Sequence, residues 1–279
     1  MSQGDPSDPL ASDARAAGPV IAAWPGRTEL AYSIGTLVTD PAQYDAMRRS
    51  FMAGGFGEPD CEFLAIDNTG ATQTSAYAGL NRVLSAARGR YVVACHQDVR
   101  LIDDGRVTLD RLLAALERAD PAWAVAGNAG GVMPGQLALR ITDPHGTDTR
   151  IGRFPVRVVS VDENFFVVKR GAGLGFSRDL DGFHVYGTDI CLVADTLGCS
   201  SYVIDFHLRH LSAGNSRSGE FAAALAAFER KWSHALRPRF VQTTCALMPL
   251  SGSAAGRAWR RFAARHVARL GKRRRRTGA

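Results

Sequence analysis

The sequence contains no long apolar run and no paired cysteines. No stretch of about 18 or more apolar residues occurs in its 279 residues, which argues against a membrane-spanning helix. The five cysteines are scattered and odd in number, and no two form a Cys-x-x-Cys pair. This pattern argues against a disulfide framework and a zinc finger, and it favours a reducing compartment. With 46% hydrophobic residues, the chain can still bury a sizeable core.

The first residues lack the features of a secretory signal peptide. They are acidic and rich in proline, with neither a basic beginning nor an apolar centre. We expect residues 1–25 to be disordered, because such a composition cannot bury enough apolar surface to fold. Together with the cysteine pattern, this predicts a cytoplasmic protein.

Acidic residues are missing from the C-terminal part of the chain, where none follows Glu229. Ten of the 34 lysines and arginines lie between Arg257 and Arg276, which leaves the rest of the chain with 24 basic against 27 acidic residues. The formal net charge of +7 is therefore a property of the tail. It does not indicate a surface for specific nucleic-acid binding.

The tail, residues 251–279, also carries apolar residues at helical spacing, among them Trp259, Phe262 and Leu270. Spacings of three and four with arginines between them are typical of a basic amphipathic helix on an anionic membrane surface. A solvated tail that packs its aromatic residues onto the body, or that binds nucleic acid non-specifically, explains the same pattern. A peripheral position at the inner face of the membrane is therefore a hypothesis.

Strand and helix patterns alternate along residues 26–250, as in a doubly wound α/β sheet with helices on both faces. After the first strand, Asp40 and Pro41 are typical of an N-cap and a first helical position. We expect strands at residues 30–38, 62–66, 91–95, 123–127, 161–169 and 202–205, and helices at 41–52, 74–87, 109–119, 189–197 and 220–236. Hairpins are expected at 137–160 and a glycine- and aromatic-rich loop at 171–187. The sequence shows no linker that would separate two domains.

The most informative segment is Arg90-Tyr-Val-Val-Ala-Cys-His-Gln-Asp98, in which a buried strand runs into His96, Gln97 and Asp98. Alternation in an extended chain would point His96 and Asp98 to the same side. Ligands of open α/β sheets bind just outside the carboxyl ends of the strands. An imidazole and a carboxylate there can hold a divalent cation, and the cation can hold phosphates. A strand that simply ends in a polar turn explains the tripeptide equally well.

Three further segments place polar groups beside strands or helices. Asp67 and Asn68 end a strand, where they fit an Asx turn as well as a contact to a nucleotide base. Asp189 opens a helix after a glycine-containing loop, where it fits a helix cap as well as a general base. His207 and His210 follow the short strand expected at 202–205. Two histidines there, with His184 nearby in sequence, favour a ligand cluster over a lone structural histidine.

In their order along the chain, these segments resemble the family 2 glycosyltransferases of the GT-A fold, in particular the branch described as streptomycin-biosynthesis-type glycosyltransferase-like domains. The resemblance covers roughly residues 30–240. It rests on six features in addition to the first strand, which ends in small and polar residues. They are Asp67-Asn68, the helix that contains Asn81, the segment Ala-Arg-Gly-Arg-Tyr-Val-Val that leads into the third strand, His96-Gln97-Asp98, Tyr186-Gly187-Thr188-Asp189 and His210-Leu-Ser-Ala-Gly214.

The resemblance implies a GT-A domain over residues 26–250 that binds a nucleotide-diphosphate sugar. It implies transfer of the sugar, with inversion, to a glycan, a lipid-linked or a small-molecule acceptor. It implies Mn²⁺ or Mg²⁺ held by Asp98 and His210, whose side chains should then lie about 4–5 Å apart, and it implies Asp189 as the catalytic base. The residues that it implies for binding the nucleotide sugar are Thr36, Asp67, Asn68, Asn81, His96 and Gln97.

One departure from the family and two rival functions remain. His96 stands where many family members carry Asp, which leaves one anion fewer and leaves open whether His96 touches the metal, although branch members share the His-Gln-Asp pattern. A nucleotidyltransferase would usually open with a glycine-rich phosphate loop that carries a basic residue, and residues 35–39 have none. A non-catalytic sugar-nucleotide or protein-binding module would be favoured by the loss of Asp189, which is present.

Overall fold

The computed structural model describes residues 30–214, 218–242, 247–256, 258–259 and 262. Its main sheet has seven strands in the order β2-β1-β3-β11-β5-β12-β9. In chain order these are β1 (Leu30–Val38), β2 (Cys61–Asp67), β3 (Gly89–Cys95), β5 (Trp123–Gly127), β9 (Val156–Val158), β11 (Phe165–Lys169) and β12 (Ser200–Val203). Five of them run in one direction, and β11 and β9 run against them.

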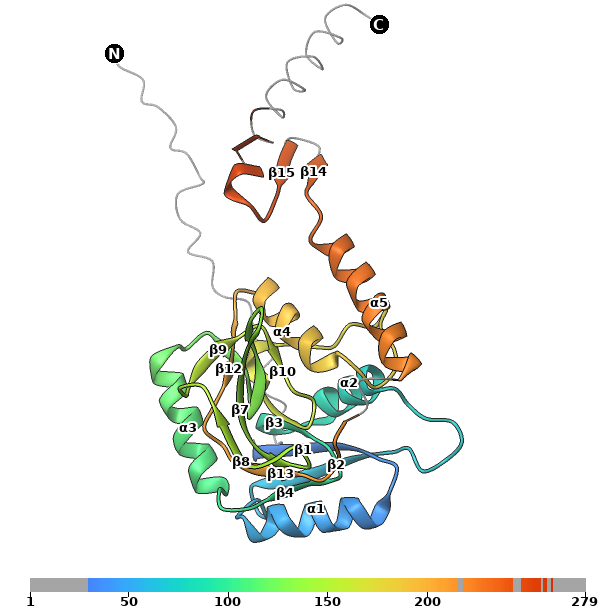
Figure 1. Ribbon diagram of the computed structural model, residues 1–279, viewed down its shortest axis with the longest axis vertical. Coiled ribbons are helices and arrows are strands. Elements are labelled where there is room, and N and C mark those ends of the chain that lie inside the picture. The colour runs from blue at the N-terminus through green and yellow to red at the C-terminus, as the bar shows by residue number, and fades with distance from the viewer. Residues whose placement is uncertain (1–29, 215–217, 243–246, 257, 260–261, 263–279) are drawn as a thin grey trace, which may run out of the picture.

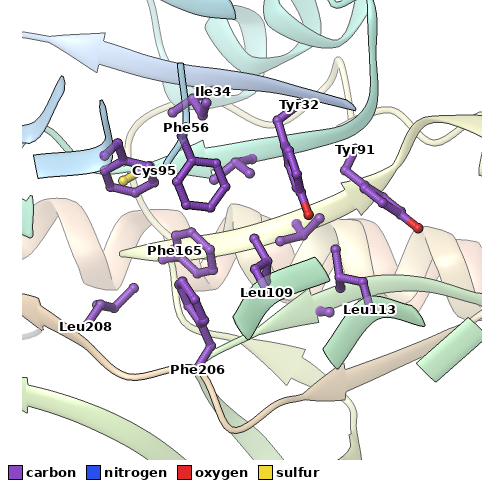
Figure 2. Close-up of a cluster of buried hydrophobic side chains, with 14 of the residues drawn as sticks. Tyr32, Ile34, Phe56, Tyr91, Cys95, Leu109, Leu113, Phe165, Phe206 and Leu208 are labelled. Carbon is purple, nitrogen blue, oxygen red and sulfur yellow. The ribbon is translucent and has the colours of Figure 1, made fainter. Parts of the chain in front are cut away.

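Helices cover both faces of the main sheet (Figure 1). They are α1 (Pro41–Ala53), α2 (Ala76–Ala86), α3 (Arg106–Ala119), α4 (Tyr186–Thr196) and α5 (Gly219–Ala235). Side chains of α1 and α3 pack around Tyr32 and Ile34 of β1 in one buried cluster, part of which is drawn in Figure 2. Side chains of α2 and α4 form a second cluster with Val92 and Phe166. The predicted α/β class with a doubly wound, mostly parallel sheet is confirmed.

A second sheet, with the order β10-β6-β7-β13-β4 and β8 paired to β7, was not predicted as a unit. Its strands are β4 (Val99–Leu101), β6 (Ala129–Met133), β7 (Gln136–Asp143), β8 (Gly146–Ile151), β10 (Ser160–Val161) and β13 (Leu208–His210). Of the region 137–160, where hairpins were expected, the β7–β8 hairpin lies in this second sheet, whereas β9 pairs with β12 in the main sheet. Its antiparallel β13–β4 pair sets His210 opposite Val99, which links the late histidine to the segment that follows β3.

Strand β3 is buried on both faces. Tyr91, Val93 and Cys95 belong to the first cluster, whereas Val92 and Ala94 belong to the second. This explains why its sequence is a continuous apolar run, since both faces of the strand are covered. Full burial of each valine stabilises the fold by about 1.5–3 kcal/mol. The position of the residues directly after Cys95 is therefore fixed by the core.

Side-chain caps open three helices. Asp40 accepts hydrogen bonds from the N–H groups of Ala42 and Gln43, and Pro41 is the first helical residue, as the sequence predicts. Ser75 caps α2 and Ser218 caps α5 in the same way. Each cap satisfies a backbone N–H that has no partner inside the helix, a contribution of about 0.5–2 kcal/mol. The cap at Ser75 also explains why α2 starts later than expected.

Some expectations about the chain need correction. The strand expected at 161–169 is interrupted, because residues 162–164 form a turn between β10 and β11. A hairpin of β14 (Arg239–Gln242) and β15 (Leu247–Leu250) stands where no element was expected. Residues 1–25, predicted to be disordered, and most of the tail at 251–279 lie outside the described residues, so the proposed division of the chain stays a prediction. In the described part of the chain, no helix has the length and apolar character needed to cross a membrane.

Candidate active site

His96, Gln97 and Asp98 follow directly after β3, at the carboxyl end of the parallel strands. The His96 N–H donates to the Asn164 carbonyl at 2.9 Å, and the Val99 N–H donates to the His96 carbonyl at 3.2 Å. The strand has ended at Cys95, and the next three residues turn. His96 and Asp98 therefore converge through a turn, and the predicted strand alternation is not what brings them together.

His96, Asp98 and His210 form one cluster. Each offers a ligand atom, and these atoms all lie within 4.8 Å of one another. Nδ1 of His96 lies 3.3 Å from Nε2 of His210, which lies 3.4 Å from Oδ1 of Asp98. Ligand bonds of about 2.1 Å place neighbouring ligand atoms roughly 3–3.5 Å apart, so the three side chains fit a single cation. Asp98 and His210 lie within reach of one ion as predicted, though at 3.4 Å they are closer than the expected 4–5 Å, and metal binding itself stays a prediction.

The electrostatics of this cluster favour the metal-binding forms of two of its members. Burial alone would raise the pKa of Asp98, but the hydrogen bond from His210 and the charges of both histidines lower it to about 2. Burial lowers the pKa of His96, and the charge of His210 lowers it further. Burial also acts to lower the pKa of His210, but the hydrogen bond and charge of Asp98 raise it above its usual value. At neutral pH, Asp98 is ionised and His96 is neutral, the states that bind metals.

Tyr186, at the start of α4, orients the His96 ring. Its phenol lies 2.8 Å from Nε2 of His96 and donates to the Glu163 carbonyl at 3.3 Å. Because the phenol donates its own proton to the Glu163 carbonyl, its oxygen can only accept a hydrogen bond from the Nε2–H of His96. The Nδ1 lone pair of His96 is then directed at the cluster, as a metal ligand requires.

Two cavities adjoin the cluster. The first, of about 390 Å³, is lined by Asp98 and by residues that follow β1 and β2. The second, of about 500 Å³, is lined by His210 and by residues of β7 and the segment before α4. Both volumes are in the usual range of small-molecule sites. Four residues line both cavities: His96, Glu163, Phe183 and Ser212. The cluster therefore stands at the boundary between the two.

Gln97 and Asn68, both predicted to contact the nucleotide sugar, line the first cavity. Oε1 of Gln97 accepts from the N–H groups of Thr39 and Asp40, each at 2.9 Å. The Asn68 side chain exchanges two hydrogen bonds of 2.8 Å with the backbone of Thr74. These amides hold the loops after β1 and β2 in place as walls of the cavity, and their contact with a ligand stays a prediction.

Thr36, Asp67 and Asn81 lie away from the cluster, and none of them lines either cavity. Thr36 is fully buried within β1. The exposed Asp67 carboxylate accepts from the N–H and hydroxyl of Thr69, which is the Asx turn that was the alternative reading. Asn81 exchanges two hydrogen bonds with the backbone of Phe176. The structure thus does not bring these three predicted residues to the site.

Asp189 does not face a cavity either. It is fully buried in the first turn of α4. Its Oδ2 accepts from the Ser177 N–H at 2.8 Å, and its Oδ1 accepts from the Ser177 hydroxyl at 2.7 Å and from the Trp232 indole at 3.0 Å. The predicted orientation toward a cleft is wrong, because these bonds direct the carboxylate into the core, where it ties α4 to the preceding loop and to α5.

Glu163 is a cavity residue that the sequence reading did not single out. It lies in the turn before β11, which was expected to be part of a strand. A signal appears only once the direction of β11 is known, since a strand that returns antiparallel to β3 must begin beside the carboxyl ends of the parallel strands. Polar residues just before such a strand share the edge of the sheet with His96.

The chain matches no protein-family model. A curated protein of Fuscovulum blasticum, named ATP synthase subunits region ORF 6, is 43% identical over 187 residues, which cover 65% of this chain and 75% of that protein. The mannosyltransferase PcManGT from Pyrobaculum calidifontis, in complex with GDP-Man and Mn²⁺, aligns at a TM-score of 0.48 and 14% identity, over 73% of this chain and 64% of that one. The structure of A197 from STIV aligns at a TM-score of 0.42 and 12% identity, over 65% of this chain and 85% of that one. Neither structural likeness is close enough to bear on the chemistry of the site.

Proposed function

Because this chain belongs to the same family as the Fuscovulum blasticum protein named ATP synthase subunits region ORF 6, a name that states no chemistry, we propose its function from the site itself. The proposed function is metal-dependent transfer of a sugar from a nucleotide-diphosphate sugar to an acceptor hydroxyl, with inversion at the anomeric carbon. The observation that carries it is the convergence of His96, Asp98 and His210 at the boundary between two cavities.

The first cavity suits the donor. Among the described residues that line it there is no lysine or arginine, so the diphosphate needs another counter-charge. His96, Asp98 and His210 would hold a divalent cation at the edge of this cavity. The positive charge that they would hold there would stabilise the negative charge that develops on the leaving nucleoside diphosphate.

The donor atoms of the cluster favour one of the two predicted metals. Two imidazole nitrogens and one carboxylate oxygen are available. Mg²⁺ prefers oxygen ligands and binds mainly through carboxylates, waters and phosphates, whereas imidazole suits transition metals. We therefore expect Mn²⁺ to bind this cluster more tightly than Mg²⁺.

The second cavity suits the acceptor. Transfer requires the anomeric carbon of the donor and the acceptor oxygen to meet in a fixed geometry. Two cavities that share lining residues on either side of the cluster allow this meeting, with the donor on one side and the acceptor on the other.

Donor binding is tested by thermal shift with a panel of UDP-, GDP- and dTDP-sugars, each with and without Mn²⁺. A ligand that binds the native state raises the melting temperature by mass action. We expect a rise that requires Mn²⁺ in the wild type and is lost in Asp98→Ala. The matched control is Asp45→Asn, which removes an exposed carboxylate on α1. If no nucleotide sugar raises the melting temperature in the presence of Mn²⁺, the proposal is wrong.

Turnover separates the proposed function from its rivals. We expect release of the nucleoside diphosphate, and NMR of the product should show the anomeric configuration opposite to that of the donor. Release of pyrophosphate from a nucleoside triphosphate and a sugar phosphate would instead indicate a nucleotidyltransferase. Binding of a nucleotide sugar without release of any product would indicate a non-catalytic module.

A further inference from the structure

We propose that Glu163 is the catalytic base that takes the proton from the acceptor hydroxyl. This inference rests on the proposed function, because it assigns the second cavity to the acceptor. In the described part of the chain, Glu163 is the one carboxylate residue that lines both cavities. A base must reach the acceptor hydroxyl where that hydroxyl attacks the donor, and this point lies at the boundary.

The sheet topology places Glu163 there through the backbone. Strand β11 runs antiparallel to β3, and Phe165 pairs with Cys95. The turn just before β11 therefore lies beside the residues just after β3, and the Asn164 carbonyl accepts the His96 N–H at 2.9 Å. The position of Glu163 next to the cluster follows from this pairing and does not depend on a flexible loop.

The start of α4 holds the Glu163 side chain. Its Oε1 accepts from the backbone N–H of Gly187 at 3.4 Å, and the N–H groups of Tyr186 and Val185 lie close enough to act on its pKa. Val185 precedes the helix with a φ of 58°, an uncommon conformation for a β-branched residue. Successive N–H groups in this arrangement form a concave anion site. A carboxylate has roughly four lone-pair positions, so the bond from Gly187 leaves room for an acceptor hydroxyl.

The environment of Glu163 suits a base that works near neutral pH. Burial raises its pKa to about 8, the charge of Asp162 adds to this, and the N–H groups at the start of α4 oppose it. The other ionisable groups around it are Tyr77 on α2, Tyr186 on α4 and His96 after β3. A general base is most effective when its pKa lies near the operating pH.

Asn164 indicates that the second cavity takes a molecule with hydrogen-bond donors. Asn164 is buried and lines this cavity, and its Oδ1 has no hydrogen-bond partner. A buried carbonyl oxygen left unpaired costs about 1–3 kcal/mol, so a partner from a bound molecule would stabilise the site. A hydroxyl-bearing acceptor supplies such a donor one residue away from Glu163.

The proposed step balances as follows. The acceptor oxygen forms a bond to the anomeric carbon while its proton moves to the Glu163 carboxylate. The bond between that carbon and the phosphate oxygen breaks, and its electron pair leaves with the nucleoside diphosphate. Attack from the face opposite the leaving group inverts the anomeric carbon.

The test is Glu163→Gln, which keeps an oxygen for the N–H groups of α4 but removes the basicity. Release of nucleoside diphosphate is measured from UDP-glucose, UDP-galactose, GDP-mannose and dTDP-glucose with Mn²⁺, with water and methyl glucoside as acceptors. We expect kcat to fall by about 10²-fold or more while the KM for the donor is unchanged. Glu58→Gln, which removes an exposed carboxylate outside both cavities, should match the wild type.

A second variant excludes a purely structural role. Formate should restore part of the turnover of Glu163→Ala, because it can replace the missing carboxylate, and it should not affect the wild type. Full turnover in Glu163→Gln, or no rescue of Glu163→Ala by formate, overturns the assignment of the base while leaving the proposed function in place. No release by the wild type from any of the four donors overturns the proposed function and this inference together.

Discussion

The phenol of Tyr186 lies 2.8 Å from Nε2 of His96, while Nδ1 of the same ring faces His210 at 3.3 Å. One tyrosine at the start of α4 thus fixes the ring that follows β3, although the two residues are 90 positions apart. Outer partners of this kind set the tautomer and orientation of a ligand histidine and contribute to metal affinity. The candidate metal site therefore depends on the packing of α4 as well as on its three ligands.

Tyr186→Phe should weaken Mn²⁺ binding by about 10–100-fold, the usual scale for losing an outer partner of a ligand. The ring still fills its place in the aromatic cluster with Tyr77 and Phe176, so the fold should be kept. Isothermal titration with Mn²⁺ measures the change. The control is Tyr77→Phe, which loses a hydrogen bond to the His184 carbonyl and has no bond to the metal cluster. Equal affinity in wild type and Tyr186→Phe would show that His96 is not oriented by this bond.

Asp189→Asn should lower stability more than catalysis. Both carboxylate oxygens of Asp189 accept hydrogen bonds from Ser177 or Trp232. In the asparagine side chain an NH₂ group replaces one of these oxygens and cannot accept, so a buried donor is left unpaired. The free energy of unfolding should fall by about 1–3 kcal/mol, measured by urea titration. Trp232→Phe removes one of the same bonds and should also lower the free energy of unfolding. A fully folded Asp189→Asn protein whose turnover drops about 10²-fold would instead restore Asp189 as the catalytic base.

Much of the fold can be predicted from the sequence because the signals are local. The continuous apolar run of β3 and the Asp40-Pro41 start of α1 report on neighbouring residues, and both elements lie where expected. The second sheet could not be predicted in this way. Its β13–β4 pair joins residues more than 100 positions apart through three-residue strands, which carry too little pattern of their own.

The site was predicted in part for the same reason. His96, Gln97 and Asp98 end a recognisable strand, so their place at the edge of the sheet follows from local pattern. The role of Asp189 depends on which way one side chain points from the first turn of a helix, and Trp232 decides this from 43 residues away. Glu163 was missed because the direction of β11 within the sheet is a non-local property.

Gly187→Ala should disturb the contact between α4 and the turn that carries Glu163. A Cβ on Gly187 would lie 2.4 Å from the Val161 carbonyl oxygen and 3.2 Å from Cγ of Glu163, so the backbone must shift. Overpacking of this kind costs about 1–3 kcal/mol and should lower the melting temperature. Gly171→Ala is the matched control, since its Cβ would meet nothing within 4 Å. An unchanged melting temperature for Gly187→Ala would mean that this contact is looser than the structure shows.

Glu163 should make stability depend on pH. Burial raises the pKa of this carboxyl from its ordinary value of 4.5 to about 8 in the folded protein. The folded state therefore binds a proton that the unfolded state has lost between these two values. The stabilisation is fully present below pH 4.5 and is lost as the pH rises through 8. Urea titrations should show that Glu163→Gln gains stability relative to the wild type between pH 5 and pH 9. If the free energies of unfolding of the two proteins differ by the same amount at pH 5 and at pH 9, the raised pKa of Glu163 is contradicted.

Deletion of residues 256–279 should abolish binding to anionic vesicles. Trp259 and Phe262 are exposed by 68% and 60%, and their rings stack at 6.2 Å, which fits the apolar side of a basic amphipathic helix. In a co-sedimentation assay, the full chain should bind phosphatidylserine-containing vesicles but not vesicles of phosphatidylcholine alone. Binding should weaken as the salt concentration rises. The double variant Trp259→Ala and Phe262→Ala keeps every positive charge and therefore separates the apolar contribution to binding from the electrostatic one. It should bind more weakly than the wild type but more strongly than the deletion. Equal sedimentation of the wild type and the deletion would rule out the tail as a membrane anchor and leave the reading of a solvated basic segment.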